Sequence, residues 1–368
     1  MRFLPTAEQR DFTRSLDALL TASDTPSAVR SWSAGDHGPG RALWERLAGA
    51  GVFALAAPEK HGGLGRLPVE MALSYRELGR HAVPGPLVET AAATALLCHL
   101  ADGGDPAPAK RLLPGLLTGE TVITLSVPEG GGYVLDPDGA DTVLVVTGAG
   151  AGASGAGGSG AATAEAGEVG AATAKAGEPG AVGPGSVGPH LRLAPGHGPL
   201  HASLDPARRL GRPDPGGELL SSGPLLAEAV GCAVRWARLA AAAQAVGVAE
   251  ELLRRTVAYV KQRTQFGVPI GSFQAVKHRL ADTLLAVEFA RPLVYGAALT
   301  LAPGDLAAAK AAAGEAAYTA ARAALQLHGA VGYTEELDLS LWLRKARPLR
   351  DAWGTPAACR AEVLAAYP

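Results

Sequence analysis

The sequence predicts a mainly α-helical protein with a small β-domain in the middle of the chain. Near both ends, apolar residues recur every three or four positions, as they do along one face of a helix. Between these regions, short runs of β-branched residues are typical of strands. The chain has 368 residues, 48% of them hydrophobic, which is enough for two or three domains with a substantial core. We expect a helical domain over 1–120, a truncated β-domain over 121–215 and a C-terminal four-helix bundle over 216–368.

The N-terminal region is expected to form a series of short helices. Thr6 offers an N-cap, and Gln9 stands three residues later, where its side chain can complete a capping box. A break rich in turn-forming residues at 57–63 precedes a helix that we expect over 70–78. The apolar run 91–100 predicts a further helix, buried on most sides.

The middle of the chain carries the strand signals. The runs 121–125 and 142–146 are short and β-branched, and both predict strands, with weaker candidates at 191–193 and 201–204. Residues 148–189 are almost entirely small or polar and contain two near-identical decapeptides in tandem. Such a segment has little to bury and cannot offset the entropy of ordering it, so we expect a flexible insertion.

The last region returns to helical periodicity. Val246, Val257 and Val260 belong to one stripe of apolar residues at spacings of three or four, and Leu280 and Leu284 belong to another. These stripes predict helices packed against one another in a bundle. They locate helix contacts and identify no ligand.

Composition excludes several classes of function. A formal net charge of −2 argues against nucleic acid or an anionic membrane as a partner. Cys98, Cys232 and Cys359 are odd in number and lack a CxxC spacing, so neither a disulfide framework nor a zinc site is expected. The sequence starts without a signal peptide and has no run long enough to span a membrane, which predicts a cytoplasmic protein. A GxGxxG match at 150–155 opens a Gly/Ala tract instead of a helix, so we do not read it as a dinucleotide site.

Two stretches between predicted helices carry more specific signals. The first is 263–277, which begins Arg-Thr-Gln-Phe-Gly, and the second is 326–336, which begins Gln-Leu-His-Gly. An arginine beside a glycine turn can hold a pyrophosphate through two hydrogen bonds, and an aromatic ring with amide side chains can flank a planar ring. Either stretch taken alone is better explained as an ordinary turn between helices.

Together, in this order and at this separation, the two stretches resemble the acyl-CoA dehydrogenase family. The segments 43–65, 77–80 and 204–210 are also similar to that family, so the resemblance covers nearly the whole chain. It implies FAD bound at a subunit interface and an oxidoreductase acting on CH–CH groups, which desaturates an acyl thioester between Cα and Cβ. It also implies a homo-oligomer, or a hetero-oligomer with a paralogous subunit, and an acyl group carried by CoA or by a carrier protein.

The resemblance assigns roles to particular residues. By similarity, one group would hold the FAD of a neighbouring subunit, another would contact its adenylate side, and one arginine would contact substrate. The assigned residues are Arg263, Gln265, Phe266, Gln274 and Thr355 for FAD, Gln326 and Gly329 for its adenylate side, and Arg238 for substrate.

The catalytic base of the family has no counterpart in this sequence. In the family a Glu in a Tyr-Glu-Gly-Thr stretch removes the α-proton, and residues 352–355 here read Ala-Trp-Gly-Thr. Trp353 therefore stands at the Glu position, and an indole cannot accept that proton. Some family members place the Glu on the first bundle helix, where this chain has Ala237, just before Arg238.

The β-domain also departs from the family pattern. The segment 127–133 leads almost directly to the strand at 142–146, which leaves little chain for the contacts that the family makes with the flavin ring. Four acidic residues are possible substitutes for the base, each better explained as a surface charge: Glu129, Glu335, Glu336 and Asp351.

Three hypotheses therefore stay open from the sequence. The chain is an FAD-dependent dehydrogenase with a relocated base, or it is a subunit without a base that pairs with a catalytic paralogue. The third hypothesis is a non-redox use of the scaffold, such as a dehydratase or a binding protein. A flavin absorption spectrum separates the third hypothesis from the other two, and co-purification with a paralogue separates the second from the first.

Overall fold

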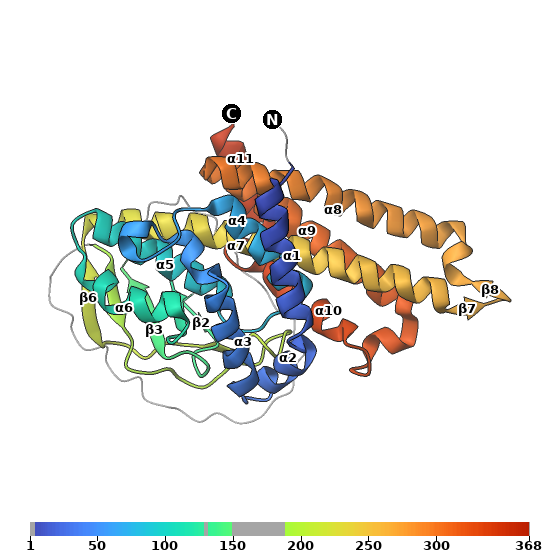
Figure 1. Cartoon of the computed structure of the whole chain (residues 1–368), viewed down its shortest axis with the longest axis horizontal. Helices are drawn as coiled ribbons and strands as arrows, with labels where there is room; N and C mark the ends of the chain where they lie inside the picture. Colours follow the sequence, from blue (N-terminus) through green and yellow to red (C-terminus); the bar gives the residue numbers. More distant parts are fainter. Residues whose placement is uncertain (1–3, 129–131, 149–187, 368) are drawn as a thin grey trace, which may run out of the picture.

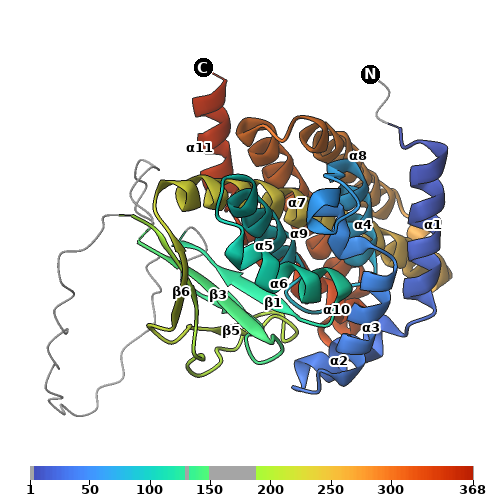
Figure 2. The ribbon, with the colours of Figure 1, turned by 60° about the vertical axis from the view of Figure 1, so that its left-hand side comes forward.

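The computed structural model describes residues 4–128, 132–148 and 188–367, and it confirms a mainly helical protein with a small β-region. The expected insertion at 148–189 lies almost wholly outside the described residues. The sheet lies at one end of the elongated molecule, and a helical bundle extends to the other end (Figure 1). Seen from the side, the helices gather on one side of the sheet (Figure 2). No helix in the described ranges combines the length and apolar character needed to cross a membrane.

Eleven α-helices are found among the described residues, six before the sheet and five after it. They are α1 Ala7–Thr21, α2 Thr25–Ser33, α3 Gly38–Gly49, α4 Pro68–Arg80, α5 Leu87–Asp102, α6 Ala107–Thr118, α7 Pro224–Gln262, α8 Gln274–Thr300, α9 Pro303–His328, α10 Leu339–Asp351 and α11 Pro356–Ala366. The expected capping box at the start of α1 is present, because the Thr6 hydroxyl accepts from the Gln9 amide and the Gln9 side chain accepts from the Thr6 amide.

The strands form one sheet of four and two short pairs. The bounds are β1 Ile123–Ser126, β2 Val134–Leu135, β3 Thr142–Thr147, β4 His190–Leu193, β5 Leu210–Gly211, β6 Glu218–Ser222, β7 Thr264–Gln265 and β8 Val268–Pro269. The order of the main sheet is β1-β3-β4-β6, with β1 and β3 parallel and the other neighbours antiparallel. β2 pairs with β5, and β7 pairs with β8 in a hairpin between α7 and α8.

The strand predictions at 121–125, 142–146 and 191–193 are confirmed, whereas two other expectations are wrong. Residues 201–204 form no strand and contribute only an isolated bridge at His201, because the chain turns there toward Asp205. Helix was expected from about residue 216, but β6 comes first and α7 begins at Pro224.

The long helix α7 joins the sheet end of the molecule to the bundle end. Its 39 residues span roughly 58 Å at 1.5 Å per residue. Its alanine-rich middle is buried on all sides, since α4, α5 and α9 pack around it. A Cβ atom added to Gly247 would lie 1.9 Å from the Arg76 carbonyl oxygen, so α4 and α7 approach as closely as they do because this residue has no side chain.

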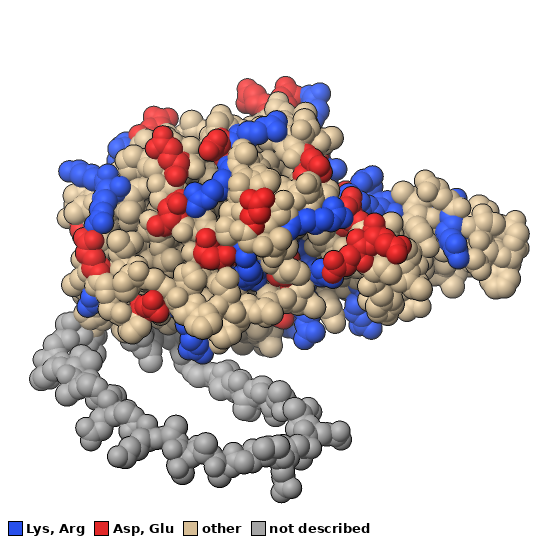
Figure 3. Space-filling model, turned by 90° about the horizontal axis from the view of Figure 1, so that it is seen from below, with Lys and Arg blue, Asp and Glu red and all other residues tan. Residues whose placement is uncertain are grey.

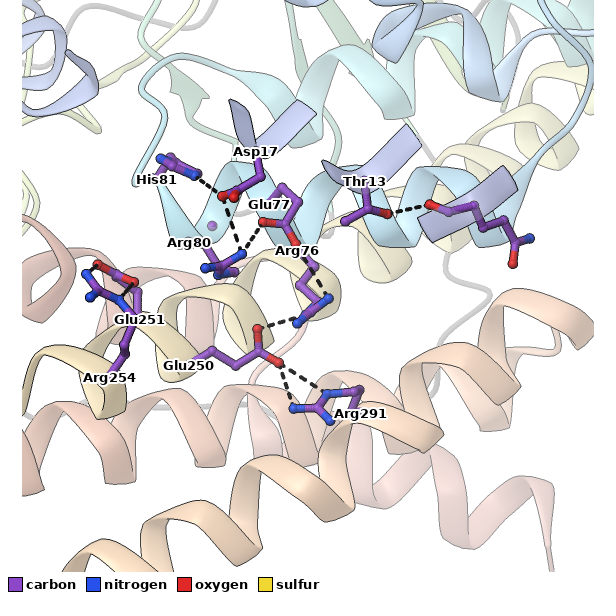
Figure 4. A network of polar contacts seen from close by, with 12 residues as sticks. Thr13, Asp17, Arg76, Glu77, Arg80, His81, Glu250, Glu251, Arg254 and Arg291 are labelled. Carbon is purple, nitrogen blue, oxygen red and sulfur yellow. Dashed lines mark hydrogen bonds and ion pairs between the residues drawn. The ribbon is translucent and has the colours of Figure 1, made fainter. Parts of the chain in front are cut away.

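Ion pairs tie α1 to α4 and α4 to the bundle (Figure 4). Arg80 Nη1 donates to Oε2 of the buried Glu77 at 2.6 Å, and Arg76 Nε donates to Glu250 Oε2 at 2.8 Å. Burial raises the pKa of Glu77, and Arg80 and Arg76 oppose that rise. Asp17, Glu77 and His81 bring ligand atoms within 4.8 Å of one another, but Arg80 already pairs with both carboxylates, so we read the cluster as structural.

Candidate active site

A cavity of about 470 Å³ lies where α5, strands β1 and β2, the segment before β5 and the end of α10 meet. One part of its lining is aliphatic, and another is polar or charged. The aliphatic residues are Leu125, Val127, Leu135, Leu204 and Leu210. Glu89, Arg208, Asp351 and Trp353 also line the cavity, so it mixes an apolar wall with groups able to fix the orientation of a ligand.

Trp353 is held on both its side chain and its backbone. Its indole Nε1 donates to Glu89 Oε1 at 3.1 Å, and its carbonyl accepts from Arg238 Nε at 3.2 Å. Its φ angle is +58°, a left-handed conformation that non-glycine residues rarely adopt. The contact with Glu89 joins the α10–α11 turn to α5 across the wall of the cavity.

Lys310, on helix α9, holds the same α10–α11 turn through hydrogen bonds to its backbone. Its ammonium is fully buried on α9 and donates to the Arg350 carbonyl at 2.8 Å and to the Gly354 carbonyl at 3.2 Å. Burial lowers the pKa of Lys310 to about 8, since desolvation disfavours the charged form. The lysine therefore satisfies carbonyls on both sides of Trp353.

Three charged cavity residues, Glu89, Arg208 and Arg347, were missed by the sequence analysis. Glu89 is only 5% exposed, and its Oε2 is buried without a hydrogen-bond partner. Arg208 is 9% exposed, and its guanidinium makes no hydrogen bond or ion pair with any described residue. In the sequence Glu89 is a single carboxylate in an apolar run and Arg208 is one of two adjacent arginines, and neither pattern distinguishes a cavity residue from a surface charge.

The acidic residues considered as substitutes for the base fall in different places. Asp351 lines the cavity, while Glu335 is exposed and pairs with Arg344, which lowers the pKa of Glu335. Glu336 is exposed as well, and Glu129 lies outside the described residues. Thus one of the three described candidates borders the cavity.

Ala237 and Arg238 lie on α7 beneath the α10–α11 turn. Ala237 is fully buried and offers no acid or base. The Arg238 guanidinium pairs with the Glu362 carboxylate at 2.6 Å as well as with the Trp353 carbonyl, so in this chain it secures the turn. Thr355, expected near FAD, accepts a hydrogen bond from the Ala358 amide and caps α11.

Apart from Thr355, the residues expected to hold FAD lie toward the opposite end of the molecule from the sheet (Figure 1). Arg263 and Gln265 are exposed in the β7–β8 hairpin, and Phe266 is 91% exposed at its tip. Gln274 begins α8 and Gln326 stands near the end of α9, both of them exposed. Gly329 follows at the end of α9 and is exposed too.

Four of the flavin candidates have polar side chains without a hydrogen-bond partner in the part of the chain that the structure describes. Among the described residues, the side chains of Arg263, Gln265, Gln274 and Gln326 make no hydrogen bond or ion pair with one another or with their neighbours. A single chain therefore does not bring them to the cavity that holds Trp353.

The chain matches two models of one protein family. Residues 6–120 match the acyl-CoA dehydrogenase N-terminal domain, and residues 228–366 match the acyl-CoA dehydrogenase C-terminal domain. The chain is 34% identical to the acyl-CoA dehydrogenase IpdE2 of Mycobacterium tuberculosis, over 92% of this chain and 91% of that protein.

Solved structures share the fold. The ChsE4–ChsE5 complex from Mycobacterium tuberculosis aligns with a TM-score of 0.76 at 23% identity and covers 100% of both chains. Butyryl-CoA dehydrogenase from Megasphaera elsdenii aligns with a TM-score of 0.73 at 21% identity, covering 100% of this chain and 99% of that one. At these identities the similarity concerns the fold alone.

Proposed function

The chain belongs to the acyl-CoA dehydrogenase family, and from that premise we propose that it is a subunit of an FAD-dependent enzyme that desaturates an acyl thioester between Cα and Cβ. In this proposal it works in a hetero-oligomer whose paralogous subunit supplies the catalytic carboxylate. The observation that carries the proposal is the Trp353 indole, which lines the cavity and donates to Glu89, at the position that the sequence resemblance assigns to the family's catalytic glutamate.

The exposed end of the bundle fits FAD from a second subunit. The Arg263 guanidinium and the side-chain amides of Gln265 and Gln274 are exposed and unpartnered among the described residues. Such free donors are available to bind a phosphate of the cofactor or the edge of its flavin ring. FAD, when bound, accepts a hydride from the substrate's Cβ. In our proposal Arg263 binds its pyrophosphate, and the hairpin positions it against the partner's cavity.

A neighbouring chain is also the simplest way to cover the apolar surface beside this hairpin. Phe266 and Phe273 pack edge to face at 6.2 Å, yet both stay exposed. The name of the ChsE4–ChsE5 complex describes two different subunits on this fold, which supports a heteromeric arrangement here.

One observation favours a second candidate function, an enzyme that is complete without a paralogue. Glu89 and Asp351 both line the cavity, and Glu89 has an unpartnered oxygen. Either carboxylate would then remove the α-proton. A non-redox use of the scaffold is the third possibility, and it predicts a purified protein without flavin.

Flavin binding tests the proposal directly. We expect the full chain, purified with its paralogous partner, to show the absorption of oxidised flavin. Arg263→Ala should weaken FAD binding by about ten- to a hundredfold, since hydrogen bonds to charged groups contribute roughly 1.5–3 kcal/mol. Lys261→Ala, which removes a nearby exposed charge, is the matched control and should change affinity little. A complex that takes up no FAD would overturn the proposal.

Catalysis by the chain alone tests the choice between the first two functions. If the isolated chain turns over acyl-CoA as fast as the complex does, the paralogue is unnecessary, and Glu89→Gln and Asp351→Asn then identify the base. If only the complex is active, the heteromeric proposal stands.

A further inference from the structure

We propose that the cavity recognises a carboxylate on the acyl group of the substrate and that Arg208 is the residue that binds it. The inference rests on the proposed function and specifies its substrate class, an acyl thioester with a second, free carboxylate. The observation behind it is a buried guanidinium without a hydrogen-bond acceptor at the edge of an open cavity.

The local chain holds Arg208 at the cavity without using its side chain. The Arg208 amide donates to the Asp205 carbonyl at 2.9 Å, which closes a tight turn before β5. Arg209 Nε and Arg350 Nε are sealed from solvent without partners, but no nitrogen of Arg208 is sealed in that way. The Arg208 side chain is thus mostly buried, but its N–H donors remain accessible from the cavity. An arginine that binds a ligand needs this arrangement.

Each nearby carboxylate is held by a group other than Arg208, although the Oδ2 atoms of Asp136 and Asp205 are buried without a hydrogen-bond partner. Asp136 Oδ1 accepts from the Arg209 amide at 2.7 Å, and Asp205 lies 3.2 Å from the Lys345 ammonium. Burial raises the pKa of Asp136 to about 7, and the charges of Arg208 and Arg209 oppose that rise. These acids compensate the charge of Arg208 from a distance and leave its planar donors unoccupied.

The chemistry of the lining favours a carboxylate over a phosphate. A guanidinium matches a carboxylate through two parallel hydrogen bonds. Glu89 and Asp351 line the same cavity and would repel a dianionic phosphate more strongly than a monoanion. The aliphatic wall, including Leu125 and Leu135, suits the hydrocarbon part of an acyl chain.

A pair of thioesters matched in length tests the inference. Adipoyl-CoA and hexanoyl-CoA have six-carbon acyl chains and differ in the terminal carboxylate. Their dissociation constants are measured by calorimetry with the full chain, in the assembly in which it purifies and saturated with FAD. We expect adipoyl-CoA to bind about ten- to a hundredfold more tightly, as a charge-assisted hydrogen-bond pair allows.

Substitutions locate the source of that preference. Arg208→Gln should abolish it and leave hexanoyl-CoA affinity unchanged, while Arg208→Lys should retain part of it because the charge stays and the planar fork is lost. Arg322→Gln is the matched control, since Arg322 is an exposed arginine on α9 that does not line the cavity, and it should leave the preference intact. Thermal unfolding verifies that each variant is folded, and Arg208→Lys covers the case in which Arg208→Gln is not.

Each remaining outcome decides the matter. Equal affinity of the wild type for both thioesters overturns the inference and leaves the proposed function standing. A preference that survives Arg208→Gln shows that another residue reads the carboxylate. If Arg208→Gln weakens FAD binding instead, Arg208 serves a phosphate of the cofactor and the inference is wrong. A complex that binds neither thioester refutes the proposed function and this inference with it.

Discussion

At the residue scale, Trp353 is a strained residue held by its surroundings. A left-handed conformation at a non-glycine residue costs of order 1–3 kcal/mol and persists only where other contacts enforce it. Here the indole is bonded to Glu89, the Trp353 carbonyl to Arg238 and the Gly354 carbonyl to Lys310. These contacts fix the turn around the indole, so Trp353 has a structural role of its own and does more than occupy the place of a missing glutamate.

We predict that Trp353→Glu raises the turnover of the FAD-loaded isolated chain with an artificial electron acceptor. The substitution would place a carboxylate at the position that the resemblance assigns to the family's base, and a general base typically contributes about 10²- to 10⁴-fold to rate. Because Glu89 lies beside the new carboxylate, like-charge repulsion should raise the pKa of the introduced Glu, so the gain should grow as the pH increases. The measurement is the rate of dye reduction between pH 6 and 9.

Trp353→Phe is the control for that experiment. It keeps an aromatic ring but leaves Glu89 Oε1 without its donor, so we expect no gain in turnover and a loss of about 1–3 kcal/mol in the free energy of unfolding. A flavin-loaded Trp353→Glu chain with no more activity than Trp353→Phe would show that the missing carboxylate does not limit the reaction.

Lys310 predicts a pH dependence of stability. Its pKa falls from 10.5 to about 8 on folding, so between these values the unfolded chain binds a proton that the folded chain has released. The free energy of unfolding should thus rise from about pH 8 to 10.5, and the burial penalty present at lower pH is on the order of 3 kcal/mol.

Urea unfolding at pH 7.5 and pH 10 checks this prediction. Lys310→Met removes the titrating group, so the variant should lose the rise in stability that the wild type shows over this interval. Lys277→Met, at an exposed lysine on α8, should behave like the wild type. An unchanged rise in Lys310→Met would mean that other groups cause it.

At the scale of elements, periodicity predicted the helices and the longer strands but not the shortest ones. β2 and β5 have two residues each, too few for an alternating pattern, and β6 has one buried residue among five, so it carries no apolar signal. The cavity shows the same limit, because Glu89 and Arg208 come from segments that only tertiary packing brings together. Trp353 was identified only through the family resemblance, because periodicity and residue spacing do not show which residues line a cavity.

Two glycines on α7 give opposite predictions for the same substitution. A Cβ at Gly247 would lie 1.9 Å from the Arg76 carbonyl oxygen and 2.8 Å from the Arg80 nitrogen, so Gly247→Ala must push α4 and α7 apart. We expect it to lower the free energy of unfolding by about 3 kcal/mol. At Gly231 the nearest atom is 3.9 Å away, and alanine there should raise stability by about 0.5–1 kcal/mol through helix propensity. Chemical denaturation of both variants tests the close crossing, and equal effects would contradict it.

At the scale of the whole molecule, one chain keeps apart the two groups of residues that our proposal unites in one site. The cavity lies beside the sheet, and the flavin candidates lie on the hairpin at the far end of the bundle (Figure 1). The protruding end of the bundle shows few charged side chains on the face seen in Figure 3. A second subunit that covers this end would unite a cavity from one chain with Arg263 from the other.

The outer face of α8 is the surface that we expect such a subunit to cover. Leu285, Phe289 and Leu293 are spaced by four residues and therefore lie on one side of the helix, with exposures of 53%, 71% and 44%. A contiguous exposed apolar stripe of this kind marks an interface in a soluble protein. The sequence alone could not reveal it, because the same spacing also predicts burial within the chain.

We therefore predict that Phe289→Glu dissociates the assembly. A glutamate there would have to lose its hydration in an apolar contact, which is costly without a partner. Leu364→Glu is the control, because Leu364 on α11 is equally exposed at 74% and lies on another helix. Sedimentation velocity at micromolar concentration should show the wild type and Leu364→Glu as oligomers and Phe289→Glu as a folded monomer. The Phe289→Glu monomer should also have lost FAD, because Arg263 can no longer reach the cavity of a neighbouring subunit. A wild-type chain that is monomeric both alone and with its paralogue would show that α8 is not an interface, and an oligomer that survives Phe289→Glu would place the interface elsewhere.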